Sequence, residues 1–532
     1  MTAVLSPSER AMQRLPPHLR RYVVPQDYAA YTPRDQAVWR HILRRLVSHL
    51  ASRAHPAYLR GLEATGIGTE RIPSMDEMNE KLAALGWSAV SVRGFIPPAV
   101  FTELQALRVL AIAGDIRTHE HIEYTPAPDI VHESAGHAPI LADADYAKFL
   151  QQAGEIGFRA IASIEDQEVY EAIRALSIVK EDPAASPAEV ANAERRLADA
   201  SAARRYVSEA TRASRLYWWT AEYGLVGSLD APRIYGAGLL SSIGESTHCF
   251  SDEVEKRPLS AAAADVDFDI TRMQPQLFVA RELPQLSEVV DDLARTLSFR
   301  RGGDHGLAEA RRARTVNHLV LADDLEVTGA VDELWEGARP AAAELTTALA
   351  VLRGPTLLSR GGKAIGPPRE LPAVVAFGEA RVPAEGSFCL TFASGLALSG
   401  RVAEGTASEL RASFGGRELP VPSRALLLAS PSLPAVVGGP GDPGAWDWHF
   451  GAPAKDEEGE ARARAHRSHA LSPELAELYR AARSLREGGR RDASSLAELS
   501  RGARRFPDEW LLRAEIDELS ADAARSVEAA AR

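Results

Sequence analysis

The sequence predicts a mainly α domain with short strand ribbons, followed by a small β-rich domain and a helical tail. In the first part of the chain, apolar side chains recur at helical spacing, as Val38, Ile42, Leu46 and Leu50 do. After residue 350, the short apolar runs AVVAFG, SFCLTFA and ALLLAS are separated by Gly, Pro and Ser, a pattern typical of a small antiparallel sheet or barrel. From Ser472 the helical pattern returns.

Local signals mark several of the helices in the first part of the chain. The stretch SMDEMNEKLAALG begins with Ser74 three residues before Glu77, a capping-box pattern, and ends at Gly86. The segment WSAVSVRGF then predicts a short strand, and PPAVFTELQALRVLAI predicts a helix with proline in its first turn. The run YAKFLQQAGEIGFRAIAS predicts a further helix.

We therefore expect four segments. They are an N-terminal arm over 1–30, a main domain over 31–350, a β-rich domain over 351–453, and a charged linker with a helical tail over 454–532. Residues 165–212 form a helical insertion in the main domain, which is either a hairpin on the outside of the core or a lid. The hairpin is favoured because long surface insertions cost little free energy.

Length, charge and cysteine content narrow the class of protein. A chain of 532 residues is long enough for two or more domains with a sizeable core. Its net charge of -12 argues against binding to nucleic acid or to an anionic membrane. Cys249 and Cys389 are the two cysteines of the sequence, too few for a disulfide framework. Because the sequence also has no signal-peptide pattern and no membrane-length apolar run, we expect a cytoplasmic protein.

Two histidines and a glutamate are the strongest candidates for a metal site. His132 and His137 lie in the run HESAGH, and Glu222 lies in YWWTAEYGL. Two imidazoles and one carboxylate leave part of a metal's coordination sphere open, which suits a non-haem Fe(II) oxygenase. The spacing is one residue too long for the H-E-x-x-H motif of zinc proteases. On an ideal α-helix, a five-residue step turns the second side chain by roughly 140°.

Five blocks of sequence resemble one enzyme family, the tetrahydropterin-dependent aromatic amino acid hydroxylases. In chain order they are GFIPPAVFTELQALRVL, IRTHEHIEYTPAPDIVHESAGHAPILADADYAKF, RLYWWTAEYGLVGS, IYGAGLLSSIGE and ITRMQPQLFVA. The blocks follow the order of the family and cover about residues 20–300. The resemblance implies a helical fold around a non-haem iron cleft and a monooxygenase that uses Fe(II), a tetrahydropterin co-substrate and O2. It also implies that His132, His137 and Glu222 are the iron ligands.

The same resemblance implies a set of residues around the amino acid substrate. Arg117 holds its carboxylate through two parallel hydrogen bonds, and Asp129 orients that guanidinium. Thr125 and Ser241 hydrogen-bond the amino acid end. Pro128 and Trp218 form walls of the aromatic pocket, with Ile270 beside them.

A second set of residues is implied for the pterin. Phe101 matches the aromatic residue on which the pterin stacks, and Gly94 and Ile96 fall in the loop beneath its other edge. Glu133 matches a carboxylate that faces the pterin, and Tyr217 belongs to the same site.

Phenylalanine is the expected substrate, with tyrosine as the product. The apolar Ile270 argues against tyrosine as the preferred substrate, while the family's tryptophan hydroxylases carry isoleucine at this position and phenylalanine at that of Trp218. A tryptophan hydroxylase is therefore the alternative within the family. The alternatives from other classes are a zinc hydrolase and a non-catalytic protein that binds a ligand with the same fold.

Overall fold

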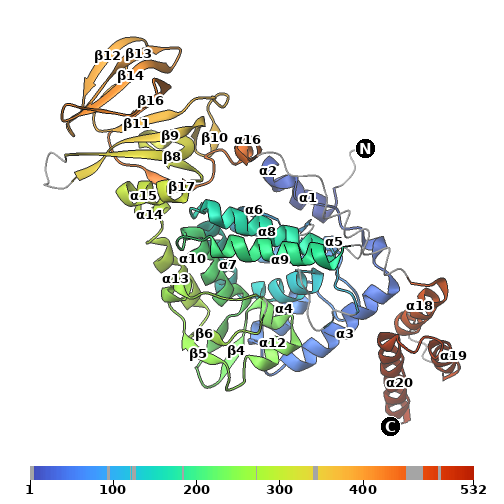
Figure 1. Cartoon of the computed structure of the whole chain (residues 1–532). Helices are drawn as coiled ribbons and strands as arrows, with labels where there is room; N and C mark the ends of the chain where they lie inside the picture. The colour runs from blue at the N-terminus through green and yellow to red at the C-terminus, as the bar shows by residue number, and fades with distance from the viewer. Residues whose placement is uncertain are drawn as a thin grey trace.

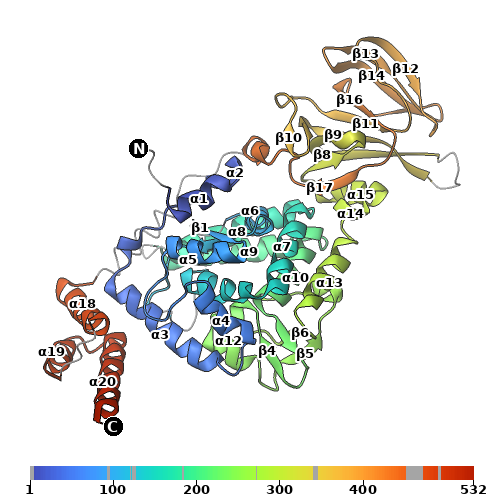
Figure 2. The ribbon, with the colours of Figure 1, turned by 180° about the vertical axis from the view of Figure 1, so that it is seen from behind.

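The computed structural model describes most of the chain and shows a mixed helix and sheet protein. The described residues are 5–92, 96–119, 122, 128–181, 185–270, 272–338, 345–450, 471–488 and 493–531. A mainly helical body carries a β-sheet domain at one end and three tail helices at the other (Figures 1 and 2). Within the described residues, no helix is both long enough and apolar enough to span a membrane.

The helical body is built from fourteen α-helices and a few 3-10 and π segments among the described residues. The α-helices are α1 (Pro7–Arg14), α2 (Pro17–Arg20), α3 (Pro33–Leu50), α4 (Pro56–Ala64), α5 (Met75–Leu82), α6 (Pro98–Ala106), α7 (Ala144–Arg159), α8 (Ile164–Glu181), α9 (Pro187–Ala202), α10 (Glu209–Tyr217), α11 (Ala237–Leu240), α12 (Ile243–His248), α13 (Pro284–Ala294) and α14 (Ser298–Arg301). The side chain of Thr32 caps α3, and Asp35 reciprocates in a complete capping box. At α5 the expected capping box is absent, because the Ser74 side chain makes no cap hydrogen bond.

Two small sheets lie within this body, as the expected strand ribbons. β1 (Ser88–Val92) pairs in parallel with β2 (Val109–Ala113). A second sheet has the strand order β4-β3-β6-β5, formed by β3 (Leu225–Gly227), β4 (Pro232–Ile234), β5 (Glu255–Pro258) and β6 (Gln276–Ala280). Both sheets are too small to hold a core of their own, and their buried residues join those of the surrounding helices.

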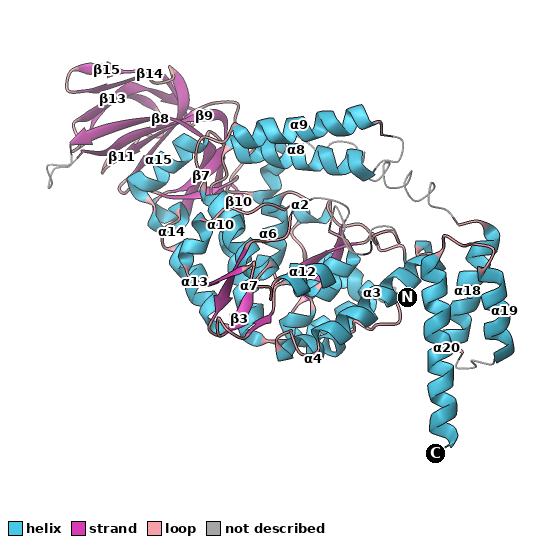
Figure 3. Cartoon of the chain, turned by 60° about the horizontal axis from the view of Figure 1, so that its bottom comes forward, coloured by secondary structure: helices cyan, strands magenta, loops and turns pink. Residues whose placement is uncertain are grey.

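The insertion in the main domain contains α8 and α9, which lie side by side along the body (Figure 3). Lys180 of α8 and Glu194 of α9 form an ion pair at 3.0 Å. Ala193 is the one fully buried residue of α9, so this helix lies on the outside of the molecule.

The β-sheet domain begins well before residue 350. α15 (Gly303–Ala313) is followed by β7 (Val316–Val320) and by the long hairpin of β8 (Leu325–Ala338) and β9 (Leu345–Arg360). The remaining strands are β10 (Lys363–Ala364), β11 (Ala373–Phe377), β12 (Gly386–Thr391), β13 (Leu396–Ala403), β14 (Thr406–Phe414), β15 (Arg417–Leu419), β16 (Arg424–Ser430) and β17 (Ala435–Gly438). Together they form an eleven-stranded sheet with the main strand order β12-β13-β14-β16-β11-β9-β8-β7-β17.

The expected boundary at residue 350 therefore falls inside β9. β7, β8 and β9 pair with one another as neighbours along the chain, but β7 also pairs with β17 and β9 with β11, and local apolar spacing carries little information about these later partners. After β17 comes a short helix, α16 (Trp446–Phe450). The expected charged linker lies largely outside the described residues.

The helical tail consists of α18 (Pro473–Glu487), α19 (Ala493–Ala503) and α20 (Trp510–Ala531), and it packs against α3. A buried ion pair lies in this contact: Arg40 of α3 donates two hydrogen bonds to Glu515 of α20, at 2.7 and 3.1 Å, and each side chain is 2% exposed. Arg486 of α18 lies 3.4 Å from the same carboxylate. The tail is thus attached to α3 in part through buried, desolvated charges.

We predict that Glu515→Ala weakens the attachment of the tail by about 3–5 kcal/mol, because it leaves the buried Arg40 and Arg486 guanidiniums without their shared anion. The double variant Arg40→Met, Glu515→Leu should recover most of this loss, because the apolar pair needs no solvation. Hydrogen exchange of α20 measures the opening. The exposed pair Arg480–Glu477 provides the control, and its removal should change stability by less than about 1 kcal/mol. Equal losses in the single and double variants would contradict the prediction.

Candidate metal centre

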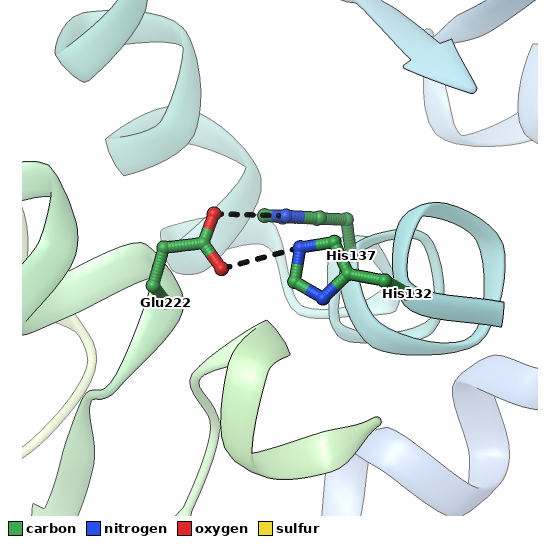
Figure 4. Close-up of side chains that lie close together, drawn as sticks. All are labelled: His132, His137 and Glu222. Atoms are coloured by element: carbon green, nitrogen blue, oxygen red, sulfur yellow. Dashed lines mark ion pairs between the residues drawn. The ribbon is translucent and has the colours of Figure 1, made fainter. Parts of the chain in front are cut away.

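His132 and His137 lie on a π-helix, η3 (Val131–His137). A π-helix closes its backbone hydrogen bonds between residues five apart, so side chains five apart lie on nearly the same face. The turn of roughly 140° that an ideal α-helix gives over five residues therefore does not apply to this segment. The two imidazole ring centroids are 5.1 Å apart, and the rings are nearly perpendicular, at 87°. Both rings face Glu222 (Figure 4).

Glu222 ends a second π-helix, η5 (Trp218–Glu222), which continues α10. The Tyr223 amide donates a hydrogen bond to the Trp218 carbonyl, five residues back, at 2.9 Å. The Glu222 carboxylate lies 3.1 Å from His137 Nε2 and 3.4 Å from His132 Nε2. Ligand atoms of the three residues lie within 4.8 Å of one another, and the described chain contains no other such group of potential metal ligands.

Two glycines allow α11 to approach both ligand segments. A Cβ atom on Gly136, between the two histidines, would lie 2.8 Å from the Ala237 carbonyl oxygen. A Cβ atom on Gly236 would lie 2.4 Å from the Glu222 carbonyl oxygen. Both distances are too short for a side chain, so the absence of Cβ atoms lets the three segments pack around the site.

Ser241 selects the tautomer of His132. The Ser241 hydroxyl donates to the Ala237 carbonyl at 2.8 Å, and its oxygen lies 3.0 Å from His132 Nδ1. Because the hydroxyl proton is already used, this oxygen accepts the Nδ1 proton of His132. In the neutral imidazole, the Nε2 lone pair then points toward Glu222, as a metal ligand requires. Ser241 contacts His132 and the carbonyls of Ala237 and Gly238, and its role at the amino acid end of the substrate stays a prediction.

The donor set fits a metal ion. Both ring nitrogens of His137 are buried and make no well-formed hydrogen bond with the described residues, although Nε2 lies 3.1 Å from the Glu222 carboxylate. A buried imidazole without partners is costly. A cation at the point where His137 Nε2, His132 Nε2 and the Glu222 carboxylate converge would engage one of these nitrogens and neutralise the carboxylate.

The three side chains shift one another's protonation. Burial alone would lower the pKa of His132, but the Glu222 carboxylate beside it raises that pKa to about 9. Burial alone would raise the pKa of Glu222, and the charges of His137 and His132 instead hold it far below its usual range. In the metal-free protein, a proton on the imidazoles therefore balances the negative charge of Glu222, as a bound cation would.

Arg117 and Asp129 form a buried pair next to the first histidine. Arg117 donates from Nε and Nη2 to the two Asp129 oxygens, each at 2.8 Å, and its backbone amide donates to the same carboxylate at 2.9 Å. The His132 amide also donates to Asp129, at 3.1 Å. Burial alone would raise the pKa of Asp129, but the adjacent guanidinium lowers it. Thr125 lies outside the described residues.

Trp218 lies in a stack of aromatic rings. The ring of Phe268 is 4.3 Å away and nearly parallel, at 10°, and the ring of Tyr223 is 4.5 Å away at 30°. Two rings this close and this parallel occupy the two faces of the indole. Pro128 and Ile270, the other expected wall residues, are exposed.

The described residues expected at the pterin gather beside α6. Phe101 of α6 meets Tyr217 edge to face, with ring centroids 5.9 Å apart, and Ile96 and Phe101 pack against the same small core. The Tyr217 hydroxyl accepts a hydrogen bond from Gln105 at 2.6 Å. Glu133 is buried next to His132, and burial raises its pKa. Gly94 lies outside the described residues.

Sequence reasoning missed three residues of the aromatic cluster. Tyr223 and Phe268 cover the faces of Trp218, and Gln274 accepts a hydrogen bond from its indole N–H at 3.4 Å. Tyr223 and Gln274 do lie inside the blocks YWWTAEYGL and ITRMQPQLFVA, which was the available signal. Their contact with Trp218 depends on the folded chain.

Comparisons with known proteins agree on one family. The family profile described as biopterin-dependent aromatic amino acid hydroxylase matches residues 21–174 and 193–301. The phenylalanine-4-hydroxylase of Pseudomonas aeruginosa is 31% identical over 266 residues, which cover 49% of this chain and 84% of that protein. That of Chromobacterium violaceum is 30% identical over 253 residues, which cover 47% of this chain and 68% of that protein.

The chain belongs to the biopterin-dependent aromatic amino acid hydroxylases. It is thus a pterin-dependent monooxygenase that acts on an aromatic amino acid, as the resemblance implied. The profile leaves residues 175–192 unmatched, which span the tip of the α8–α9 hairpin, and it ends where the segment leading to the β-sheet domain begins. Among solved structures, the Chromobacterium violaceum phenylalanine hydroxylase with bound oxidised Fe(III) is 27% identical, covers 55% of this chain and 90% of that chain, and has a TM-score of 0.42.

We predict that binding of a divalent ion at neutral pH expels about one proton per ion, because a metal ligand must be a neutral imidazole. A pKa of about 9 for His132 keeps that ring protonated in the metal-free protein at neutral pH. Metal affinity should therefore rise with pH and level off above about 9. Calorimetric titrations in buffers of different ionisation enthalpy count the protons. A pH-independent affinity between neutral pH and the plateau would contradict the prediction.

The pair of His132 with Glu222 also makes a prediction for stability. The folded-state pKa of His132 is raised above its ordinary value of 6.5, so the stability from this pair is fully present below 6.5 and is lost as pH rises through about 9. The metal-free protein should lose stability over this window, and the metal-loaded protein should lose less. Denaturation midpoints across the window measure this difference, and identical pH profiles would refute it.

Ser241→Ala should lower metal affinity by about 10–100-fold, because His132 loses the acceptor that fixes its tautomer. The matched control is Ser246→Ala, which removes a buried hydroxyl bonded to the Ile243 carbonyl and should leave affinity unchanged. Dissociation constants from metal titration of both variants provide the comparison.

Proposed function

We propose that this protein is an Fe(II)- and tetrahydropterin-dependent monooxygenase that converts L-phenylalanine to L-tyrosine with O2. The observation that carries the proposal is the convergence of His132, His137 and Glu222 in a chain whose family is pterin-dependent. Curated relatives about 30% identical to it are named phenylalanine-4-hydroxylases, which supports phenylalanine as the substrate.

Iron is the proposed metal because two imidazoles and one carboxylate on one face leave positions open for other ligands, as non-haem Fe(II) oxygenases require. His132, His137 and Glu222 would hold the ion. When bound, iron and the pterin together supply the activation of O2. The protein contributes by fixing the ligands, through Ser241 for His132 and through α11 for both ligand segments.

We assign Arg117 to the carboxylate of the amino acid. Its Nε and Nη2 are bound to Asp129, which fixes the plane of the guanidinium, while the one contact of its Nη1 with a described residue is long, 3.4 Å to the Ile122 carbonyl. A planar guanidinium oriented in this way is prepared for a carboxylate. Because Asp129 also binds the His132 amide, the substrate arginine and a metal ligand share one anchor.

The aromatic ring of the substrate is assigned to the space beside Trp218, with Pro128 and Ile270 near its rim. Both faces of the indole are covered, so the substrate would meet its edge, an arrangement that aromatic pairs favour. The pterin is assigned to the α6 side, where Ile96, Phe101 and Tyr217 gather, with Glu133 between this side and the metal ligands. As the resemblance implies, Thr125 is assigned to the amino acid end of the substrate and Gly94 to the loop beneath the pterin.

The deciding experiment is anaerobic loading with Fe(II), followed by O2, tetrahydrobiopterin and each aromatic amino acid, with product identification. We expect tyrosine from phenylalanine at the highest kcat/KM. Faster conversion of tryptophan would favour the alternative substrate. Tightly bound zinc with no uptake of O2 would favour a hydrolase, and loss of all turnover with the three ligands intact would favour a ligand-binding protein.

Arg117→Lys should raise the KM for the amino acid at least about tenfold and leave the KM for pterin nearly unchanged, because lysine keeps the charge but cannot make two parallel hydrogen bonds. Phe101→Leu should do the reverse. Iron content must be measured in both variants, since Asp129 also supports His132. An unchanged amino acid KM in an iron-replete Arg117→Lys enzyme would remove Arg117 from the substrate site.

A further inference from the structure

Gln274 is a buried side chain whose amide is fully engaged. It is 2% exposed; its oxygen accepts the Trp218 indole N–H at 3.4 Å, and its nitrogen donates to the carbonyls of Asp269 and Arg272 at 2.9 and 2.8 Å. Because only the nitrogen can donate to two carbonyls, the orientation of the amide is determined. The Gln274 side chain therefore connects the Trp218 indole to two carbonyls of the loop that precedes Gln274 in the chain.

This loop, described over 267–270 and 272–274, contacts Trp218 a second time through Phe268, whose ring stacks on the indole at 4.3 Å. It also carries Ile270, which follows Phe268 by two residues and is 47% exposed. The shape of the loop thus decides where Phe268 and Ile270 stand relative to the indole.

Trp218 is also tied to the metal centre by its place in the chain. Trp218 is the first residue of η5, which ends in Glu222. The second face of its indole is covered by Tyr223, the residue directly after Glu222. The indole is therefore held on one side by the segment that carries a metal ligand. On the other side it is held by the loop that Gln274 closes.

We propose that Gln274 is a positioning residue that sets the selectivity of the enzyme for the aromatic ring. It holds Trp218 and the loop residues 267–270 and 272–274 in one relative position and so defines the pocket in which the ring is accepted. This inference rests on the proposed function, in which Trp218 lines the ring pocket. Without the amide, one indole N–H and two loop carbonyls lose their partners, and the loop shifts to satisfy them with water.

The test is Gln274→Met, which keeps the length of the side chain and removes all three hydrogen bonds. Gln285→Met is the matched control. Gln285 also bridges backbone groups, accepting from the Arg281 amide at 2.7 Å and donating to the Leu259 carbonyl at 3.1 Å, outside the Trp218 cluster. Both variants are assayed as full-length iron-loaded enzymes with phenylalanine and with tryptophan.

We expect Gln274→Met to raise the KM for phenylalanine and to lower the preference for phenylalanine over tryptophan, each by about tenfold, the scale on which pockets separate apolar rings. Less product should form per pterin oxidised, while pterin KM and iron stoichiometry stay at wild-type values. Gln285→Met should keep wild-type selectivity. The effects of Gln274→Met and Trp218→Phe on selectivity should be non-additive, because both remove the same hydrogen bond.

Equal changes in the amino acid and pterin parameters, or additive effects with Trp218→Phe, would overturn the role of Gln274. So would unchanged selectivity in a folded, iron-replete Gln274→Met enzyme. A wild-type enzyme that accepts tryptophan but not phenylalanine would overturn the proposed substrate instead. In that case, the change in the KM for tryptophan caused by Gln274→Met still decides whether Gln274 positions the Trp218 side of the ring pocket.

Discussion

The metal centre depends on a five-residue backbone step. His132 and His137 would point in different directions on an α-helix, and the π-helical segment η3 brings them to one face. π-helical segments are rare, so neighbouring groups must support this one. The Ser134 hydroxyl donates to the Ile130 carbonyl, Asp129 accepts the His132 amide, and α11 packs against Gly136.

Asp129 connects the metal ligands with the proposed substrate arginine. Its two oxygens accept four hydrogen bonds, three from Arg117 and one from the His132 amide. A carboxylate buried this deeply is stable only when it is paired in this way. The same pairing gives the guanidinium and the first ligand histidine a common reference point, so neither can move without disturbing the other.

The β-sheet domain is attached close to the helix that leads to Glu222. Glu209, the first residue of α10, accepts hydrogen bonds from the Ser298 amide and hydroxyl at 2.8 and 2.7 Å, just before the chain enters α15. Arg314 binds Glu165 of α8, and the Thr315 hydroxyl donates to the Ala162 carbonyl at 2.7 Å. The part of the chain beyond the family match therefore meets the catalytic domain at the start of α8, and His305 of α15 lies 3.9 Å from Glu209 at the start of α10.

The residues of the metal site could be named from the sequence, because their types and the blocks around them carry the chemistry. His132, His137 and Glu222 converge as expected, and Arg117 pairs with Asp129. The helical body, the strand β1 and the tail helices follow from apolar spacing, which reports which face of an element is buried, but β2 lies in the segment RVLAI that was expected to be helical. Only the tertiary structure decided the π-helical step, the contact of Ser241 with His132, the rings around Trp218 and the start of the sheet at Val316. Each of these depends in part on a partner far along the chain, namely α11, Ser241, Phe268 or β17, whose approach local spacing and propensity do not encode.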